Sequence, residues 1–236
     1  MKIAAVIPAY NEENSIAGVV AEINAISKKC GIEIIAVVVN DCSKDRTAEI
    51  IDVVDCVALH LPVNLGIGGA VQTGFKYAFD NDFDFAVQVD GDGQHPAEFI
   101  PLLSDHLKKN SLDVVIGSRY LDKKGFQSSM IRRTGIKYFK WLNKLFTGIE
   151  IHDSTSGFRM MNRRALEIVY EYYPDEYPEP EAIILFSKRG LKIGEVAVEM
   201  RERQGGVSSI NSFSAVYYMF KVSLAIFFTF MRTSKN

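Results

Sequence analysis

The feature that most constrains the fold is a regular alternation of strand-like and helix-like segments through the first half of the chain. The strand-like segments are short and rich in apolar residues, and they cover residues 2–8, 32–39, 55–61, 84–90 and 112–117. Helix-like segments lie between them, at residues 14–29, 45–54, 68–80 and 97–109. Strands that alternate with helices form a mostly parallel sheet, because right-handed crossovers place the helices on its two faces. We therefore predict an α/β sandwich with a mostly parallel central sheet.

The second half of the chain is less regular. The pattern predicts a helix at 129–147, a short strand at 157–162, helices at 163–172 and 180–189, and a strand at 191–199. A final apolar helix is expected at 212–231. We therefore expect one α/β domain over residues 1–210 and a C-terminal helix within residues 211–236.

The composition excludes several classes of protein. The 236 residues are 47% hydrophobic and 24% charged, which is ordinary for a globular chain with a large buried core. A net charge of −2 argues against a general nucleic-acid binder. Cys30, Cys42 and Cys56 are few and widely spaced, so they favour a reducing compartment. The apolar run in residues 1–8 is too short for a secretory signal and is expected to form the first strand.

A pair of carboxylates follows the fourth predicted strand, in Asp90-Gly91-Asp92. Open α/β folds bind ligands at this carboxyl edge of the sheet. Two carboxylates so close repel each other, and a divalent cation held together with substrate phosphates would offset their charge. Asp and Gly are also common in turns, so the motif alone leaves a plain turn open. A helix-loop-helix calcium site is excluded, because His95 and Pro101 stand where that loop needs Gly and Glu.

Polar residues also follow the first two strands. Tyr10 and Glu12 come after the first strand and could line a pocket above the sheet edge, although Asn11 or Asn14 could simply cap the next helix. Asp41 comes after the second strand. Its carboxylate could accept a hydrogen bond from a base or a ribose, or it could cap the following helix.

Two further signals are weaker on their own. Glycines at 66, 68 and 69 precede a helix-like segment. They could let the backbone approach a diphosphate at the positive end of that helix, or form a flexible connection. Arg119 follows the fifth strand, where its guanidinium could hold a phosphate or form a surface ion pair.

Taken in order, these motifs resemble the family 2 glycosyltransferases, and within them the polyprenyl-phosphate sugar transferases of the dolichol-phosphate mannosyltransferase type. The resemblance extends over residues 3–210 and rests on segments 7–12, 39–43, 64–66, 90–92, 117–120, 153–159 and 203–208. It implies a single-domain, Rossmann-like sandwich of the GT-A type.

The resemblance also implies a role for each matching residue. The expected catalytic residues are Asp92, Asp153 and Arg203. The expected contacts to the nucleotide sugar are Pro8, Tyr10, Glu12, Val39, Asp41, Gly66, Asp90, Gly91, Gln94, Arg119 and Ser208. The expected metal ligands are Asp92 and, beside it, Asp90, which would hold Mg²⁺ or Mn²⁺.

Two positions depart from the family pattern. Asn40 replaces the first acid of an Asp-Asp-Gly-Ser motif, and Ser209 replaces a lysine that often follows the residue matched by Ser208. The missing cation weakens the case for GDP-mannose as the donor. We therefore expect a UDP-sugar, either UDP-glucose or UDP-N-acetylglucosamine.

The reaction that the resemblance implies is an inverting sugar transfer to a polyprenyl (undecaprenyl) phosphate. A phosphate oxygen of the lipid would attack the anomeric carbon while the metal offsets charge on the departing diphosphate. Asp153 would orient the acceptor or take a residual proton, or else cap a turn. Two alternatives stay open: a soluble glycosyltransferase that acts on a sugar or protein, and an inactive scaffold that binds a membrane partner.

Two segments favour association with a membrane surface. Basic residues at helical spacing in 129–147, with Trp141 among them, suit anionic lipid, or else a charged face over an ordinary core helix. Residues 213–231 approach the length of a membrane span, but Lys221 makes spanning costly by about 3 kcal/mol. We expect a helix in the membrane interface, or one docked on a small integral membrane protein, at the cytoplasmic, inner face of the cell membrane.

Overall fold

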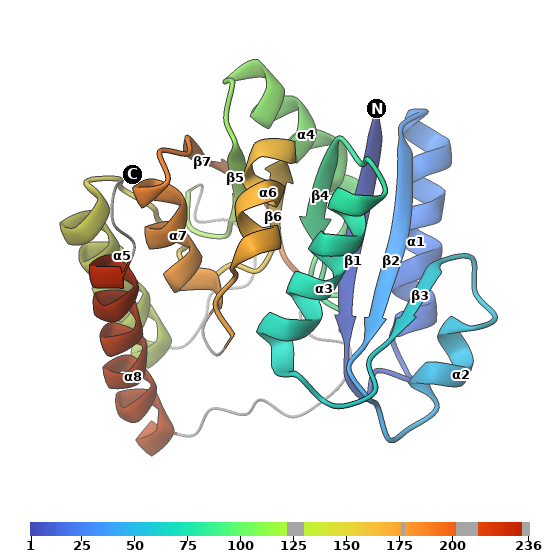
Figure 1. Ribbon diagram of the computed structural model, residues 1–236, viewed down its shortest axis with the longest axis horizontal. Coiled ribbons are helices and arrows are strands. Elements are labelled where there is room, and N and C mark those ends of the chain that lie inside the picture. Colours follow the sequence, from blue (N-terminus) through green and yellow to red (C-terminus); the bar gives the residue numbers. More distant parts are fainter. Residues whose placement is uncertain (122–129, 176–177, 202–211, 233–236) are drawn as a thin grey trace.

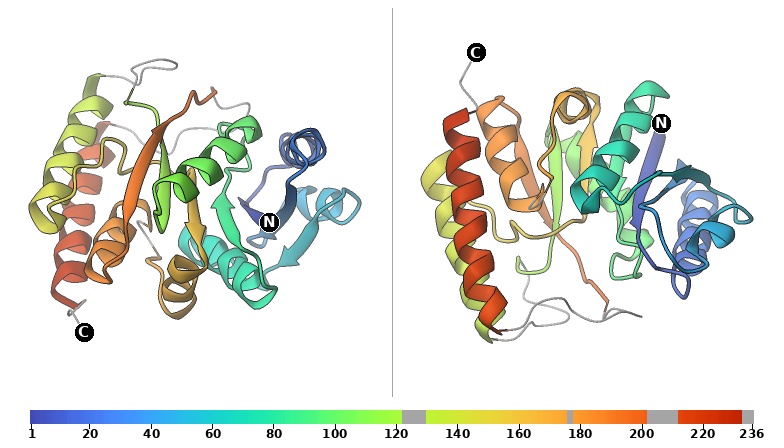
Figure 2. Two further views of the ribbon diagram at one scale, coloured as in Figure 1. Left: turned by 90° about the horizontal axis from the view of Figure 1, so that it is seen from above. Right: turned by 60° about the horizontal axis from the view of Figure 1, so that its bottom comes forward.

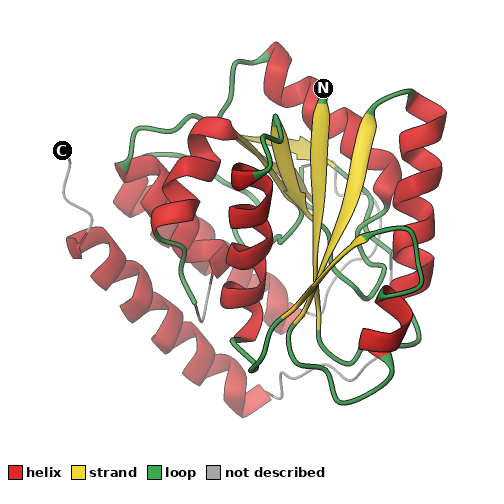
Figure 3. Cartoon of the chain, turned by 45° about the vertical axis from the view of Figure 1, so that its right-hand side comes forward, coloured by secondary structure: helices red, strands yellow, loops and turns green. Residues whose placement is uncertain are grey.

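A seven-stranded sheet forms the centre of the computed structural model, which describes residues 1–121, 130–175, 178–201 and 212–232 (Figures 1 and 3). The strands are β1 (Lys2–Ala9), β2 (Glu33–Asn40), β3 (Val57–His60), β4 (Phe85–Gln88), β5 (Val114–Ser118), β6 (Arg159–Asn162) and β7 (Ile193–Ala197). The helices are α1 (Ile16–Cys30), α2 (Thr47–Ile51), α3 (Gly66–Asp80), α4 (Ile100–Lys109), α5 (Met130–Thr147), α6 (Arg163–Glu171), α7 (Pro178–Lys188) and α8 (Ser212–Arg232), with a short 3₁₀ turn at Ala97–Phe99. Each predicted segment overlaps the corresponding element, with ends that differ by a few residues, and several strands, such as β3 and β4, are shorter than expected.

The sheet is mostly parallel, as predicted. Its strand order is β3-β2-β1-β4-β6-β5-β7. β6 is antiparallel to both of its neighbours, β4 and β5, whereas the other pairs of neighbouring strands are parallel. Inserting β6 between β4 and β5 places the chain just before it, residues 153–158, beside the ends of both strands.

Both faces of the sheet are covered by helices, so β1, inside the sheet, is apolar from Ile3 to Ala9. On β1, Ile3, Ala5 and Ile7 pack into a core with α1 and α4, while Ala4 and Val6 face a second core with α3, α6 and α7. Burial of side chains of this size contributes about 1.5–3 kcal/mol each.

The strand order also defines where a ligand can bind. From β1 the chain moves outward through β2 and β3, and it then returns to the other side of β1 to form β4. The loops after β1 and β4 therefore leave the sheet in opposite directions. Open α/β sheets bind ligands outside the carboxyl ends of the strands at such a point, and we call this region between β1 and β4 the crevice.

α5 and α8 lie side by side beyond α7 at one side of the molecule (Figures 1 and 2). Phe139 and Leu142 of α5 share an apolar cluster with Ile184 of α7 and with Val222 and Ile226 of α8. The predicted C-terminal helix therefore packs on the rest of the chain through one of its faces.

Candidate active site

The candidate site lies at the carboxyl ends of β1 and β4, where segments distant in sequence meet. Soon after β4 the chain continues through Asp90, Gly91 and Asp92. A Cβ atom on Gly91 would lie 3.2 Å from the carbonyl oxygen of Pro8 and 3.4 Å from Cγ of Glu12. Glycine at this position lets the two acids pack closely against the end of β1 and the loop after it.

A third segment, residues 153–158, closes on the same acids. A Cβ atom on Gly157 would lie 2.7 Å from Nε2 of Gln88 and 3.4 Å from Oδ1 of Asp90. The segment is held by Ser156, whose hydroxyl donates to the carbonyl oxygen of Gly117 at 2.7 Å. The Asp153-to-Arg159 motif therefore lies next to Asp90 through Gly157.

A buried arginine, Arg159, holds this third segment through hydrogen bonds to its backbone. The guanidinium of Arg159 donates to the carbonyl oxygens of Ser154, Ser156 and Glu179. Burial lowers the pKa of Arg159. Because the carbonyl groups of two turns and of the first turn of α7 converge on this one cation, Arg159 fixes the segment next to Asp90.

The two acids of the central motif differ in exposure. The Asp90 side chain is 32% exposed, and its Oδ1 accepts a long hydrogen bond of 3.4 Å from Nε2 of Gln88. Asp92 is buried, and its Oδ1 accepts the N–H of Gln94 at 3.0 Å. Gly93 supplies the positive φ of 77° that this turn requires. Asp90 is thus the more accessible of the two carboxylates, and Asp92 is buried.

His95 is part of the site, although sequence reasoning assigned it no role. Its Nδ1 accepts the N–H of Asp90 at 3.0 Å, its Nε2 lies 3.5 Å from Oδ2 of Asp90, and its ring stacks on Phe158. Burial lowers the pKa of His95; the charges of Asp90, Asp92 and Asp153 oppose that shift, and Arg119 adds to it. A neutral His95 therefore sits among the predicted acids and holds the backbone of Asp90.

Asp90 and Asp92 fit a hard divalent cation of the predicted kind. Mg²⁺ is usually held by one or two carboxylates together with substrate phosphates, rather than by a cage of protein ligands. Within the described residues, no group of three or more His, Cys, Asp or Glu side chains is placed to hold a metal ion. A cation at this pair would therefore depend on oxygen atoms of a substrate.

The loops after β1 and β2 are tied to each other. The N–H of Asn11 donates to Oγ of Ser43, and Oδ1 of Asn11 accepts the N–H of Lys44. Asn11 and Asn14 do not cap α1, whose N-cap residue is Ser15. Ser15 donates its hydroxyl to Oε2 of Glu12 at 2.9 Å.

Tyr10 and Val39, both predicted to contact a nucleoside, lie in opposite environments. Tyr10 is exposed at the end of β1. Val39 is fully buried against α3, where a Cβ on Gly74 would lie 3.2 Å from its Cγ2. Val39 therefore presents no surface to a ligand in this arrangement, whereas Tyr10 does.

Asp41 forms the N-terminal cap of α3. Its Oδ1 accepts the N–H of Leu65 at 2.6 Å, and its Oδ2 accepts the N–H of Gly66 at 2.9 Å. Gly66 has a positive φ of 77° at this turn. The anion at the positive end of α3 is thus the chain's own carboxylate, and these two N–H groups are already in use.

Arg119 forms a two-pronged ion pair with Asp153. Its Nε and one Nη donate to the two carboxylate oxygens, each at 2.7 Å, and its backbone N–H donates to Oδ2 at 3.1 Å. The Asp153 side chain is 0% exposed and that of Arg119 is 17% exposed. Burial acts to lower the pKa of Arg119, but the hydrogen bond and charge of Asp153 outweigh it and the pKa is raised. Among the described residues, the second Nη of Arg119 has no acceptor.

Two predicted site residues, Arg203 and Ser208, lie outside the described residues. The last described residue before them, Arg201, lies next to the turn that carries Asp92, because its N–H donates to the carbonyl oxygen of Gln94 at 3.0 Å. The roles of Arg203 and Ser208 stay predictions.

The basic face of α5 is partly neutralised by an acid that follows the helix. Lys140 and Lys144 donate to the two oxygens of Glu150, at 2.8 and 2.7 Å. These hydrogen bonds lower the pKa of Glu150 to about 2. Lys137 is exposed. The pairing of Glu150 with both Lys140 and Lys144 was not predicted from the sequence.

Exposed apolar side chains cover the outer sides of α5 and α8. We call this the α5–α8 surface, and it consists of Trp141, Leu145, Phe220, Leu224, Phe227, Phe228 and Met231. Phe146 contacts Phe227 at a ring distance of 6.5 Å, so the two helices form one continuous surface. No helix in the described part of the chain has the length and hydropathy of a membrane span.

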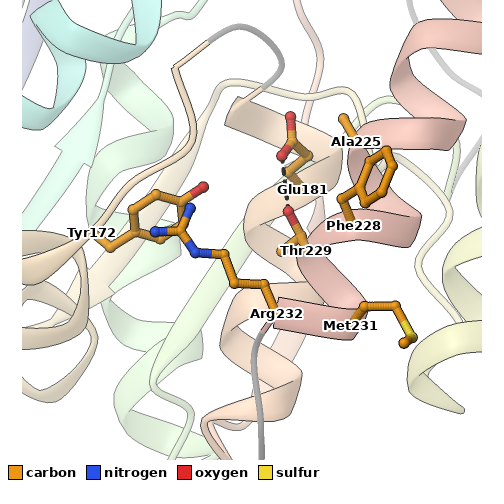
Figure 4. Close-up of a pocket in the computed structure, with 7 residues that line it drawn as sticks. All are labelled: Tyr172, Glu181, Ala225, Phe228, Thr229, Met231 and Arg232. Atoms are coloured by element: carbon orange, nitrogen blue, oxygen red, sulfur yellow. Dashed lines mark hydrogen bonds between the residues drawn. The ribbon is translucent and has the colours of Figure 1, made fainter.

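A pocket of about 450 Å³ lies between α7 and α8, away from the predicted site residues (Figure 4). In it, Thr229 of α8 donates to Oε2 of Glu181 at 3.0 Å, and the Arg232 guanidinium lies 5.2 Å from the ring centre of Tyr172. These polar contacts fix the end of α8 on α7.

Comparison of the sequence with known proteins gives a family and several relatives. The model of the glycosyl transferase family 2 matches residues 4–169. The UDP-N-acetylglucosamine–dolichyl-phosphate N-acetylglucosaminyltransferase of Methanococcus voltae is 31% identical over 82% of this chain and 83% of its own length. The polyprenol monophosphomannose synthase of Mycolicibacterium smegmatis is 27% identical over 92% of this chain and 84% of its own length.

Solved structures share the fold. The glucosyl-3-phosphoglycerate synthase of Mycobacterium tuberculosis, crystallised with Mn²⁺, UDP and glucosyl-3-phosphoglycerate, superposes with a TM-score of 0.67 at 19% identity, over 98% of this chain and 79% of that one. S. aureus TarS 1–349 in complex with UDP has a TM-score of 0.60 at 19% identity, and the chain spans 64% of its length. At these identities the likeness shows the fold alone, a GT-A-like α/β sandwich, as predicted. The family match and the identity with the M. voltae enzyme together show that the chain belongs to the glycosyl transferase family 2.

Proposed function

We propose that this family 2 glycosyltransferase moves a sugar from a nucleoside diphosphate sugar to a polyprenyl phosphate at a membrane surface. The observation that carries the proposal is the close approach of Gly91, between Asp90 and Asp92, to Pro8 and Glu12 at the carboxyl ends of β4 and β1. The crevice joins carboxylates that suit a cation to a loop that suits a nucleoside. The M. voltae relative is named as a dolichyl-phosphate N-acetylglucosaminyltransferase and the M. smegmatis relative as a polyprenol monophosphomannose synthase. Both names support a polyprenyl phosphate as the acceptor.

We propose a UDP-sugar, UDP-glucose or UDP-N-acetylglucosamine, as the donor. The M. voltae relative is named for UDP-N-acetylglucosamine, and the departure at Ser209 supports the same choice. Tyr10 and Glu12 lie where a nucleoside would enter from the β1 side. Asp41 would contribute through the turn that it holds at Gly66, since its carboxylate is bonded to the backbone there.

Mg²⁺ or Mn²⁺ would be held by Asp92 and Asp90 together with the donor diphosphate. The cation would supply positive charge to the departing diphosphate. His95 keeps the Asp90 backbone in place for this task, and Gln94, whose N–H binds Asp92, fixes the other carboxylate.

The transfer itself is proposed to be inverting. An oxygen of the lipid phosphate forms a bond to the anomeric carbon as the bond between that carbon and the diphosphate oxygen breaks, and the nucleoside diphosphate leaves. A phosphate monoester is already anionic near neutrality, so it needs little help from a general base. Both oxygens of Asp153 are held by Arg119. Asp153 therefore acts by holding Arg119, whose remaining Nη would face a phosphate, with Arg203 as a further cation.

The α5–α8 surface would place the crevice at the inner, cytoplasmic face of a membrane. Aromatic and aliphatic side chains beside Lys137 suit insertion of an amphipathic helix pair into anionic lipid. A small integral membrane protein that covers the same surface is the alternative anchor.

A thermal-shift screen with UDP, GDP, CDP and dTDP, each with Mg²⁺ or Mn²⁺, tests the donor and the cation together. Binding to the folded state raises the melting temperature by mass action, and we expect the largest rise with UDP and a divalent cation. Turnover is then measured with radiolabelled UDP-glucose or UDP-N-acetylglucosamine and a short-chain isoprenyl phosphate. If no label moves into organic solvent when the lipid acceptor is present, while label is transferred to a sugar or protein acceptor, the proposal is contradicted. Full turnover in the presence of a chelator would contradict it as well.

A further inference from the structure

One carboxylate outside the predicted site, Glu195, holds the loop that carries Asp153. Glu195 lies in β7, where it pairs in register with Ile116 of β5. Its Oε1 accepts the N–H of Asp153 at 2.9 Å, and its Oε2 accepts the N–H of His152 at 2.7 Å. Oε2 also lies 3.0 Å from Nδ1 of His152.

These contacts make Glu195 the start of a chain of hydrogen bonds that runs through Asp153 to Arg119. The backbone N–H groups of two consecutive residues bind one rigid carboxylate, which fixes both the position and the direction of the peptide there. The Asp153 side chain then takes the Nε, one Nη and the backbone N–H of Arg119. A shift of Glu195 would therefore move Asp153, and with it the fork of Arg119.

The position requires a carboxylate and not only a side chain of the right size. The Glu195 side chain is 6% exposed, and an acid so buried needs donors for both of its oxygens. It has them, and no lysine or arginine among the described residues forms an ion pair with it. A glutamine would keep one acceptor oxygen but direct an NH₂ group at a backbone N–H, so one of the two N–H groups would lose its partner.

We propose that Glu195 is a positioning residue for the sugar transfer, which acts on the reaction through Asp153 and Arg119. The inference rests on the proposed function, because it assumes that the Arg119–Asp153 pair serves the phosphates. Among the described residues, the hydrogen bonds of Glu195 lead to His152 and Asp153 and not to Asp90 or Asp92. With the remaining Nη of Arg119 at the phosphate of the lipid acceptor, the effect of Glu195 falls on turnover and not on donor binding.

The test is a double-mutant cycle on turnover, with Glu195→Gln, Asp153→Asn and the combined variant. Misplacing a catalytic group by about 1 Å can cost about 100-fold, and we expect kcat of Glu195→Gln to fall 10- to 100-fold, with KM for the UDP-sugar within twofold of wild type. In the combined variant, kcat should be no lower than in Asp153→Asn alone, because Glu195 acts only through Asp153. Glu199→Gln is the matched control, since Glu199 is an exposed acid two residues beyond β7, and its kcat should equal that of wild type.

Each outcome assigns a cause. A Glu195→Gln enzyme with wild-type kcat, or losses that multiply in the combined variant, overturns the inference while leaving the proposed function intact. Absence of lipid-linked product with the wild-type enzyme overturns the proposed function instead. If Glu195→Gln does not fold, Glu195→Asp keeps the charge and both acceptors but shortens the side chain, and the same non-additive loss of kcat with Asp153→Asn is expected.

Discussion

Two aspartate sites stand at the same edge of the sheet, and they are built in opposite ways. Asp90 is 32% exposed, and its two oxygens have long contacts: Nε2 of Gln88 lies 3.4 Å from Oδ1, and Nε2 of the neutral His95 lies 3.5 Å from Oδ2. Asp153 is 0% exposed, and its oxygens take three hydrogen bonds from Arg119. The first site has charge to offer a ligand, whereas the second already holds its counter-ion. Both residues are aspartates at one edge of the sheet, so the partners decide which acid binds a ligand and which acid holds a scaffold together.

The test with the largest expected effect removes Arg119, the counter-ion of the buried Asp153. Arg119→Met leaves the Asp153 carboxylate buried without a cation, and breaking one side of a buried pair costs about 3–5 kcal/mol of folding stability. Denaturant unfolding measures this loss. Adding Asp153→Asn to Arg119→Met should restore part of it, because no isolated charge then stays buried. A single variant as stable as wild type would show that Asp153 is not held in the way described.

A change at the exposed acid, Asp90, should instead lower the activity and leave the stability unchanged. Asp90→Asn keeps an acceptor for Nε2 of Gln88 at a side chain that is 32% exposed, so the free energy of unfolding should change by less than about 0.5 kcal/mol. Turnover should fall more than about 100-fold, since loss of a cation ligand exceeds the 10- to 100-fold typical of residues that only support ligands. Chelation of the wild-type enzyme should give the same loss. Asp80→Asn, at an exposed acid that ends α3, is the control and should change neither quantity.

His95 lies between the two sites and should have a smaller effect on activity. His95→Phe keeps the ring that stacks on Phe158 but removes the acceptor that Nδ1 offers to the N–H of Asp90, and we expect turnover to fall about 10-fold, in the range for residues that orient metal ligands. Burial lowers the pKa of folded His95 below its unfolded value of about 6.5. The unfolded chain therefore takes up a proton that the folded chain does not, and wild-type stability decreases as pH falls below about 6.5.

The variant provides the control for that pH dependence. Stability of His95→Phe should decrease less than that of wild type between pH 7 and pH 5, measured by denaturant unfolding at each pH. Equal pH slopes for the two proteins would show that His95 is accessible to protons in the folded state.

The elements of the fold were predictable because their signals are local. Apolar strands of four to eight residues, separated by helical segments, indicated each strand and helix before β5 and also the parallel order of β1 and β2. The reversed strand β6 was not predictable as such, because its direction depends on pairing with β4 and β5, which lie far away in sequence.

The site was predictable to the same extent. Asp90 and Asp92 follow a strand, and the carboxyl ends of parallel strands share one edge, so sequence alone placed them near Pro8 and Glu12. The pairing of Arg119 with Asp153 spans 34 residues and depends on where β6 inserts. His95 carries no periodic signal, and its role follows from a turn that directs its ring back to the Asp90 backbone.

The smallest expected effect concerns the lysines of α5 and sharpens the contrast between held and available charge. Glu150 binds Lys140 and Lys144, and its pKa of about 2 keeps it charged at every pH where vesicle binding is measured. Glu150→Gln removes one negative charge beside the α5–α8 surface. Since each net charge near an anionic membrane changes affinity about fivefold, binding to phosphatidylserine-containing vesicles should tighten by about that factor, with no change for neutral phosphatidylcholine vesicles. Glu167→Gln, at an exposed acid of α6, makes the same change in net charge elsewhere; if it tightens binding equally, the α5–α8 surface is not the face that meets the lipid.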